Sequence, residues 1–240
     1  MRSPVFRPAN APDSVLVAVS ERRIAPPETE SPTAFLARTF VGELGVPDLP
    51  IVRATQVHGD RVVVVQDSPA PGETVDAGRC DALLTRLPGV GLVVQTADCV
   101  PVLLAAADAI GAVHAGWRGA AANVARAAAE SLLGLTGDPG FVRAWLGPSI
   151  GACCYEVGEE VASRFPAAFA RPSKDGKFLL DLAGLVRRQL EDAGIPRERI
   201  SSDPSCTMCG GERYASYRRH REKAGRMIAL VARVGDRMRQ

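Results

Sequence analysis

Histidine is scarce in this chain: only three residues, His58, His114 and His220, occur among 240. A multicopper oxidase needs many more imidazole ligands than three to hold several copper ions. The scarcity therefore argues against multicopper chemistry, and any metal site built on these histidines must recruit other ligand types as well.

The sequence also lacks a strong charge imbalance and a long apolar run. Its formal net charge is +2, which indicates neither a nucleic-acid-binding surface nor a patch attracted to a membrane. The most apolar stretches, around Val62–Val65 and Val100–Ala107, are about as long as a strand and too short to cross a bilayer. Residues Met1–Asn10 contain no apolar core of a signal peptide. We therefore expect a cytoplasmic protein with neither nucleic acid nor membrane as a partner.

Apolar patterning predicts an α/β fold. Strands are expected at Val15–Val19, Ile51–Thr55, Arg61–Gln66, Asp81–Thr85, Val90–Gln95, Val100–Ala105, Ile110–His114, Phe141–Leu146 and Arg226–Val234. Helices are expected at Thr33–Leu44, Ala120–Leu135, Glu156–Arg164 and Leu182–Ala193. Several strands are apolar on both faces, which is typical of a sheet covered on both sides. We predict one domain over residues 1–240, a layered sandwich in which helices cover a mixed β-sheet.

Two of the three histidines lie beside glycine at the ends of predicted strands, in Gln56-Val57-His58-Gly59 and Val113-His114-Ala115-Gly116. Cys99 lies between two predicted strands. Two imidazoles and one thiolate would leave the fourth position of a zinc ion open, as catalytic sites do. Spacing alone leaves the ordinary alternative open, in which each residue is a satisfied histidine or a small buried cysteine.

A glycine-rich turn, Gly116-Trp117-Arg118-Gly119, precedes the predicted alanine-rich helix. Backbone N–H groups at a helix start attract anions, and Arg118 adds a forked donor suited to phosphate or carboxylate. The alternative is a plain helix start with a solvated arginine. The stretch from Gly147 to Glu156 follows a strand in the same way, and either a pocket wall or a structural loop fits it.

The other cysteines form two pairs, Cys153-Cys154 and Cys206-Thr207-Met208-Cys209, besides a single Cys80. In a reducing compartment they are expected as thiols or ligands rather than as a disulfide framework. One C-x-x-C is half of a zinc site, and the adjacent pair is badly spaced to complete it, so we expect no second metal site. A basic stretch from Arg213 to Arg219 follows, which fits a solvated face or a surface for an anionic or aromatic substrate; His220 is expected to be exposed.

Several motifs occur together in a fixed order. They are Gln56-Val57-His58-Gly59, Asp81–Thr85, Thr96-Ala97-Asp98-Cys99-Val100-Pro101, His114-Ala115-Gly116-Trp117-Arg118-Gly119, Gly147–Gly151 with Cys154-Tyr155-Glu156-Val157, and Cys206-Thr207 with Ser216–Arg219 and Gly225-Arg226. Over residues 50–234 the sequence resembles the YfiH family of purine nucleoside phosphorylases, also labelled laccase-domain or polyphenol oxidase proteins.

The resemblance implies a layered α/β domain, related to a Cys-hydrolase-like fold, with zinc held by His58, Cys99 and His114. It implies phosphorolysis of adenosine, inosine and methylthioadenosine to free base and ribose 1-phosphate, and deamination of adenosine. Its partners would be a purine nucleoside and phosphate, and the protein would be a monomer or homodimer. Candidate substrate or phosphate contacts are Arg118, Gln56, Gly116 and Tyr217. Asp98 is expected in a supporting or structural role, since on a regular strand it points away from Cys99.

Residues 1–49 depart from the family pattern. The family usually has a Gly-Gly-Val-Ser turn and an Asn-Arg pair, where this chain has Val17–Glu21 and Leu36–Phe40. Substrate preference is therefore open. So are three other functions: a copper polyphenol oxidase, a hydrolase with Cys99 as nucleophile and a histidine as base, and a non-catalytic, zinc-stabilised nucleoside-binding protein.

Overall fold

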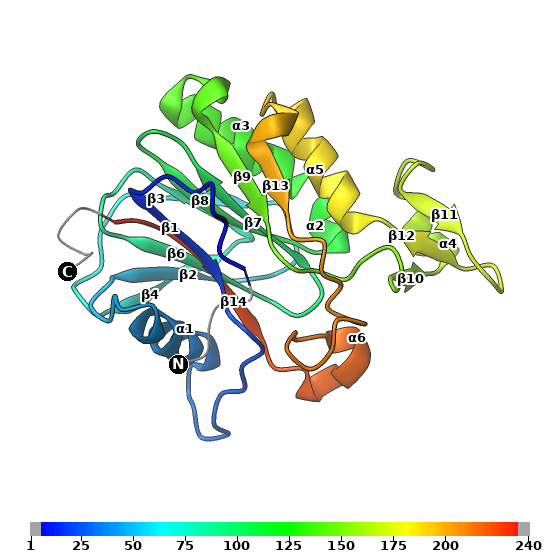
Figure 1. The fold of residues 1–240 in the computed structure, drawn as a ribbon, viewed down its shortest axis with the longest axis horizontal. Coiled ribbons are helices and arrows are strands. Elements are labelled where there is room, and N and C mark those ends of the chain that lie inside the picture. The colour runs from blue at the N-terminus through cyan, green and yellow to red at the C-terminus, as the bar shows by residue number, and fades with distance from the viewer. Residues whose placement is uncertain (1–5, 235–240) are drawn as a thin grey trace.

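Two β-sheets stacked face to face form the centre of the fold in the computed structural model, which describes residues 6–234 (Figure 1). The first sheet has the order β1 (Val15–Val19), β14 (Met227–Arg233), β6 (Gly91–Thr96), β2 (Ile51–Thr55) and β4 (Thr74–Arg79). The second has the order β13 (Ile200–Ser202), β9 (Arg143–Leu146), β7 (Val100–Ala105), β8 (Ile110–Ala115), β5 (Ala82–Thr85) and β3 (Val62–Val65). Both sheets mix parallel and antiparallel pairs.

Alternate residues of the two sheets meet in a dry layer between them. Leu92 and Val94 of β6 belong to the same buried cluster as Leu103 of β7 and Trp145 of β9. The Trp145 ring is fully buried, and its indole N–H donates to the Asn10 side chain over 2.8 Å. Because a buried indole N–H needs a partner, this bond ties the N-terminal segment to the second sheet.

Helices cover the outer face of each sheet (Figure 1). Helix α1 (Pro32–Glu43) packs Leu36 and Phe40 on the first sheet. The second sheet is covered by α2 (Trp117–Ala121), α3 (Val124–Thr136) and α5 (Leu182–Asp192). These layers explain why strands such as β6 and β7 are apolar on both faces, and they confirm the predicted α/β sandwich.

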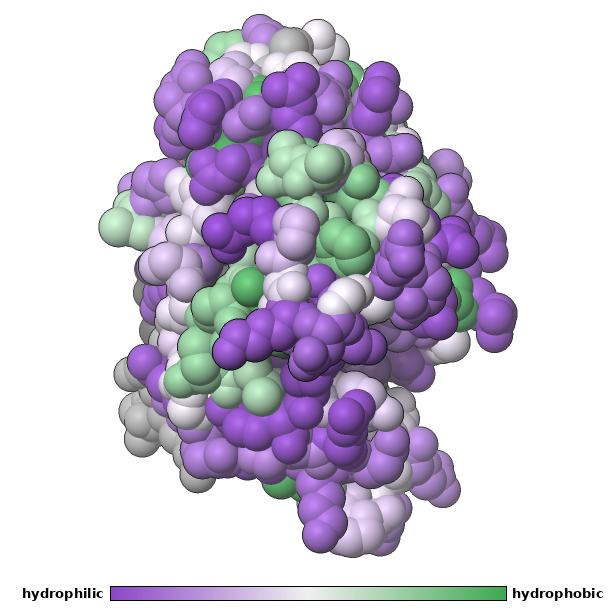
Figure 2. Space-filling view, turned by 90° about the vertical axis from the view of Figure 1, so that its right-hand side faces the viewer, coloured by the Kyte–Doolittle hydropathy of each residue, from purple (hydrophilic) through white to green (hydrophobic). Residues whose placement is uncertain are grey.

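A small third sheet extends from one end of the molecule, to the right in Figure 1. It consists of β10 (Glu156–Val157), β12 (Phe178–Leu180) and β11 (Ala170–Pro172), beside the short helix α4 (Glu159–Ala162). Helix α6 (Tyr217–His220) lies at the same end. Figure 2, which looks onto this end, shows hydrophobic patches enclosed by a mostly hydrophilic surface.

The structure corrects three predictions. Two stacked sheets replace the single mixed sheet. The helix expected over Ala120–Leu135 is two helices, because Asn123 has a left-handed backbone with φ of 64°. The helix expected over Glu156–Arg164 begins with β10, and only Glu159–Ala162 are helical. Strands β4 and β10–β13 were not predicted, since they are short or poor in apolar residues.

Within residues 6–234, none of the helices combines the length and apolar character that crossing a membrane requires. The first five residues, which belong to the segment expected to contain no signal peptide, lie outside the described part of the chain.

Asn123 offers a test of the break between α2 and α3. A non-glycine residue in the left-handed region costs roughly 1–2 kcal/mol, and asparagine tolerates it better than alanine. We expect Asn123→Ala to have a free energy of unfolding about 1 kcal/mol lower than that of Asn123→Gly, in urea titrations. Both variants lose the bond from the Gln189 amide to Asn123 Oδ1, which is 3.2 Å long, so the pair isolates the backbone effect. Equal stabilities would contradict this explanation of the helix break.

Candidate metal centre

The second sheet brings His58, Cys99 and His114 together by strand pairing. Cys99 directly precedes β7, and His114 lies opposite Pro101 near the end of the antiparallel strand β8. His58 lies in the loop before β3, whose first residue pairs with the first residue of β5, next to β8. Three sequence-distant segments therefore meet at one end of these neighbouring strands.

The three side chains form a cluster of possible metal ligands. One ligand atom from each lies within 4.8 Å of the others. The two imidazole rings are 4.7 Å apart between centroids and nearly perpendicular, at 83°. His114 is buried, Cys99 is half-buried and His58 is exposed. The cluster thus has its His114 side in the protein interior and its His58 side open to solvent.

Asp81, which is fully buried, connects the two histidine ligands. Its carboxylate accepts a 2.8 Å hydrogen bond from His114 Nδ1, which leaves His114 Nε2 to face the cluster. The same carboxylate accepts backbone N–H groups of Val57, His58 and Gly59 over 2.8–3.1 Å. A carboxylate behind a ligating histidine fixes its tautomer and orientation. The sequence motif beginning at Asp81 was recognised, but its function as an anchor was not predicted.

Glycines 116 and 119 allow the ligands to approach the turn that follows β8. A Cβ on Gly116 would lie 2.9 Å from His58 Cδ2 and 3.1 Å from Cys99 Sγ. A Cβ on Gly119 would lie 2.7 Å from the Gly59 carbonyl oxygen. The space beside Gly116 and Gly119 is therefore filled by His58, Cys99 and the Gly59 carbonyl, and a side chain at either position would collide with them.

Protonation in the metal-free cluster follows from its contacts. Burial alone would raise the pKa of Cys99, but the neighbouring His114 and His58 rings lower it to about 6. Burial also opposes a charge on His114, yet the Cys99 thiolate and the Asp81 carboxylate raise the pKa of His114 to about 9. The Cys99 sulfur is therefore a thiolate at neutral pH, as a metal ligand must be.

The donor set fits zinc. Tetrahedral zinc with nitrogen at about 2.0–2.1 Å and sulfur at about 2.3 Å needs ligand atoms about 3.3–3.6 Å apart. The three candidate ligand atoms lie within 4.8 Å of one another, so they are gathered closely enough for one ion to be placed among them. Two nitrogens and one sulfur occupy three positions, and the exposed side leaves a fourth for water or substrate.

Arg118 lies two residues after Gly116, whose space the cluster fills. The helix that begins at this turn, α2, is five residues long rather than a long helix, and the helix dipole is weak in so short a segment. The exposed Arg118 guanidinium stacks over the Trp117 ring at 4.3 Å. Phosphate binding by Arg118 and the backbone at Gly116 stays a prediction.

Gln56 and Tyr217 have protein partners in the structure. The Gln56 amide donates to the Gln95 carbonyl and accepts the Gln95 N–H, both over 2.8 Å, so it ties the His58 loop to β6. The Tyr217 hydroxyl donates to Glu222 over 3.1 Å on an exposed face. These contacts show how both side chains are held, and they leave a direct substrate contact by either residue as a prediction.

Asp98 holds the loop beside Cys99, in line with its predicted structural role. Its backbone is left-handed, with φ of 87°. One carboxylate oxygen accepts the Thr207 hydroxyl and the other accepts the Arg218 N–H, each over 2.6 Å. The stretch from Gly147 to Glu156, for which a pocket wall and a structural loop were both open, packs here too, since the Ile150 N–H donates to the Asp98 carbonyl over 2.9 Å.

Tyr155 is a further member of the site that was not singled out from the sequence. Burial raises the pKa of its hydroxyl to about 12, and the Cys99 thiolate adds to this rise. The Arg218 guanidinium lies over its ring at 5.5 Å, and the Arg218 backbone N–H donates to Asp98, the neighbour of Cys99. Tyr155 is therefore a neutral, half-buried hydroxyl in the wall that Asp98 and Arg218 join.

The structure places the remaining cysteines and histidine differently from what their spacing suggested. The adjacent pair was expected to be badly spaced to complete a site with the C-x-x-C, but the sulfur atoms of Cys153, Cys154, Cys206 and Cys209 lie within 4.8 Å of one another and form a group that could hold a metal ion. His220 is half-buried rather than exposed, with Nε2 3.1 Å from Glu212. Sequence spacing could not reveal either, because both depend on how two distant loops fold together.

The fold and the cluster together define an α/β enzyme with a two-histidine, one-cysteine site at the ends of neighbouring strands. Residues 35–234 match the family described as multi-copper polyphenol oxidoreductase laccase. The chain belongs to this family, the one that its sequence motifs resemble, and it is an enzyme. The match begins at residue 35, earlier than the residue 50 expected from the motifs, so it includes part of the segment 1–49 that departs from the family pattern.

Relatives with assigned activities cover most of the chain. A purine nucleoside phosphorylase of Xylella fastidiosa is 37% identical over 200 residues, which are 80% of this chain and 75% of the relative. Adenosine deaminase RL5, from an unknown prokaryotic organism, is 33% identical over 209 residues, or 81% and 79% of the two chains. The crystal structure of Bacillus licheniformis hypothetical protein YfiH superposes with a TM-score of 0.79 at 28% identity, covering 91% of this chain and 92% of that one.

Asp81→Asn tests the anchor. The amide cannot accept both the His114 N–H and the three backbone N–H groups without a repulsive contact, so we expect zinc affinity at the trio to fall about 10–100-fold. Competition with a chromophoric chelator measures the affinity. Asp76→Asn is the matched control, since Asp76 binds Arg53 and Thr55 away from the cluster. Unchanged affinity in Asp81→Asn would contradict the anchoring role.

The metal-free protein should show a reactive Cys99. Because its pKa is lowered to about 6, the thiolate persists until the pH falls through that value, and alkylation should slow only below it. His114→Ala removes the main stabilising charge and should move this midpoint upward. Peptide mass spectrometry after iodoacetamide pulses at several pH values measures it, and Cys80, whose pKa burial raises to about 11, is an internal unreactive control. A Cys99 midpoint as high as that of an ordinary thiol would exclude the thiolate–imidazolium pair.

Proposed function

We propose that this protein is a zinc-dependent purine nucleoside phosphorylase that converts adenosine, inosine and methylthioadenosine to free base and ribose 1-phosphate. The observation that carries the proposal is the open two-histidine, one-cysteine cluster anchored by Asp81. The activity named for the Xylella fastidiosa relative supports the substrate class. The proposed partners are a purine nucleoside and phosphate. The proposed oligomeric state is a monomer or homodimer, and the proposed location is the cytoplasm.

Within this proposal His58, Cys99 and His114 hold the ion, and Asp81 keeps His114 in the tautomer that presents Nε2. Bound zinc would polarise a substrate oxygen or lower the pKa of a bound water to about 7. His58 is the exposed ligand, so nucleoside and phosphate would enter on its side of the cluster.

Arg118 would bind phosphate, because its guanidinium is exposed, is held flat against Trp117 and can donate two parallel hydrogen bonds. The backbone at Gly116 would border the same space. Tyr155 would orient a substrate oxygen through its neutral hydroxyl. Gln56 would act indirectly, by positioning the His58 loop through Gln95. We retain Tyr217 as a candidate base contact on α6.

Deamination of adenosine is a second proposed activity, favoured by the resemblance to adenosine deaminase RL5. Zinc deaminases of other folds use a nitrogen-and-sulfur ligand set with a carboxylate that transfers protons. Here Asp81 and Asp98 are both engaged with protein donors. The proton transfer would therefore pass through water or the Tyr155 hydroxyl.

The alternatives make different demands on the same residues. A copper polyphenol oxidase is suggested by the family description, but the three ligands here hold one ion, and multicopper chemistry needs several. A Cys99 hydrolase would keep its activity after metal removal. A non-catalytic nucleoside-binding protein would lose stability on chelation and turn over nothing.

The central test is phosphate-dependent release of free base from inosine, adenosine, methylthioadenosine and guanosine, by zinc-loaded and chelated protein. We expect activity only with zinc, and a kcat/KM at least about 100-fold lower in His114→Ala, which loses a ligand. His220→Ala controls for loss of a histidine and should retain activity.

Other outcomes separate the alternatives. Stoichiometric copper with phenol oxidation would replace the proposal by an oxidase. Turnover that survives chelation and disappears in Cys99→Ala would replace it by a hydrolase. Absence of turnover by folded, zinc-loaded protein on every nucleoside would reject the enzymatic proposal.

A further inference from the structure

Four cysteines from two distant loops meet outside the catalytic cluster. Cys153 and Cys154 lie in the turn after β9, and Cys206 and Cys209 lie in the loop after β13. The four sulfur atoms lie within 4.8 Å of one another, and those of Cys153 and Cys209 are 3.8 Å apart. A disulfide needs about 2.05 Å. Four sulfurs around zinc at about 2.3 Å are about 3.8 Å apart, which is the distance observed between the sulfurs of Cys153 and Cys209.

Backbone N–H groups and glycines shape the cluster for sulfur ligands. The Gly151 N–H donates to Cys206 Sγ over 3.2 Å, which stabilises negative charge on that sulfur. The Gly210 N–H closes the C-x-x-C turn on the Cys206 carbonyl over 2.8 Å. A Cβ on Gly210 would lie 2.5 Å from that same oxygen. The chain thus has glycine where a tight turn brings two cysteines to one side.

The two loops are also joined to each other without any metal. The Thr207 N–H donates to the Ser149 carbonyl over 3.0 Å, in a parallel bridge between Ser149 and Cys206. In the sequence, Cys153-Cys154 looked badly spaced to join the C-x-x-C. The pairing of Ser149 with Cys206 brings the two loops, and therefore the two cysteine pairs, together. Such preformed ligands lose little conformational entropy when a cation binds.

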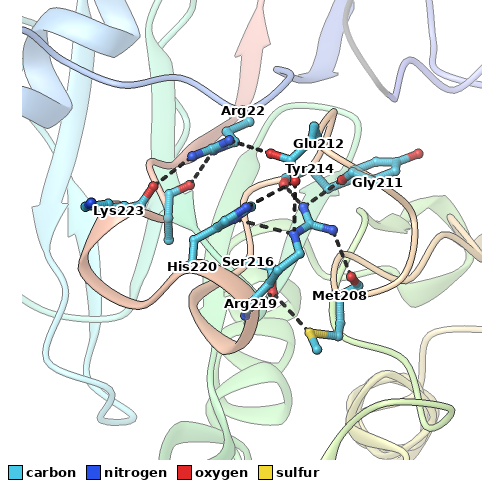
Figure 3. Close-up of polar contacts among 10 residues, drawn as sticks. Arg22, Met208, Gly211, Glu212, Tyr214, Ser216, Arg219, His220 and Lys223 are labelled. Atoms are coloured by element: carbon cyan, nitrogen blue, oxygen red, sulfur yellow. Dashed lines mark hydrogen bonds and ion pairs between the residues drawn. The ribbon is translucent and has the colours of Figure 1, made fainter.

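Arg219 fixes the loop that contains Cys209, as Figure 3 shows. Its guanidinium donates to the carbonyls of Met208, Gly211 and Tyr214 over 2.6–2.9 Å. Glu212 lies between Arg219, His220 and Arg22 in the same network. The basic stretch from Arg213 to Arg219 is thus not simply a solvated face, since one of its arginines holds the C-x-x-C loop in shape.

We propose that Cys153, Cys154, Cys206 and Cys209 bind a second zinc ion, with all four coordination positions filled by thiolates. Binding releases the four thiol protons to solvent and forms four Zn–S bonds, with no change of oxidation state. Four protein ligands are the pattern of a structural rather than a catalytic site. The ion would lock together two loops that both contact Asp98, the neighbour of Cys99, through Ile150 and Thr207.

Metal counting on the full-length protein tests this proposal. By inductively coupled plasma mass spectrometry after desalting, we expect about two zinc ions per chain in the unaltered protein and about one in Cys153→Ser/Cys209→Ser. His114→Ala should also hold about one, at the cysteine site. Cys80→Ala, which removes a buried thiol outside both clusters, should retain about two. Substitution by cobalt should give a thiolate charge-transfer band that weakens strongly in the double cysteine variant and only slightly in His114→Ala.

A measurement on the unaltered protein avoids dependence on variant folding. Cys153 and Cys209 are exposed, so as free thiols they should react quickly with N-ethylmaleimide. We expect zinc-loaded protein to protect both residues and chelated protein to expose them. Equal labelling with and without zinc, zinc content unaffected by the double substitution, or a Cys153–Cys209 disulfide in protein purified under reducing conditions would each overturn the proposal.

Discussion

The hydrogen-bonded carboxylate of Asp81 is the constraint on which the candidate metal centre depends. It is fully buried and accepts four donors, three from the backbone around His58 and one from the His114 ring. A buried carboxylate would be costly without such partners, and here each partner is also a part of the site. One side chain therefore fixes the loop that supplies the exposed ligand and the tautomer of the buried one. The glycines at 116 and 119 complete the arrangement, because any side chain there would displace the ligands or the loop that Asp81 holds.

The stacked sheets explain why the ligands come from distant points of the chain. Cys99 directly precedes β7, His114 is near the end of β8, and Asp81 directly precedes β5, so antiparallel pairing of these three strands places them side by side. The loops after β9 and β13 are adjacent because those two strands are parallel neighbours. The proposed second site lies in these loops, and Asp98 connects them to Cys99. The two sites would thus have distinct functions. The open cluster would bind substrate, and the closed four-cysteine site would stabilise the loops that form the wall beside it.

Much of this fold could be predicted from the sequence, because long, apolar and regularly spaced segments determine it. The bounds of β1, β2 and β7 match the predicted ranges, and α1 and α5 differ by a residue or two at their ends. Short elements could not be predicted, since β10–β13 have two or three residues and are stabilised by neighbours rather than by their own pattern. The three candidate ligands were selected by their glycine neighbours and their family motifs, and the fold brings their side chains together. Asp81, Tyr155 and the four-cysteine cluster were missed because their significance lies in contacts between distant segments, which one-dimensional spacing does not record.

Zinc-edge anomalous diffraction from crystals of the zinc-loaded protein tests the central claim most directly. The account predicts a strong anomalous peak within bonding distance of His58, Cys99 and His114, with a light atom of solvent or substrate in the fourth position and the His114 Nδ1 bond to Asp81 retained. A zinc-loaded crystal with no anomalous density at this cluster would contradict the account, as would an ion there coordinated by four protein ligands with no open position.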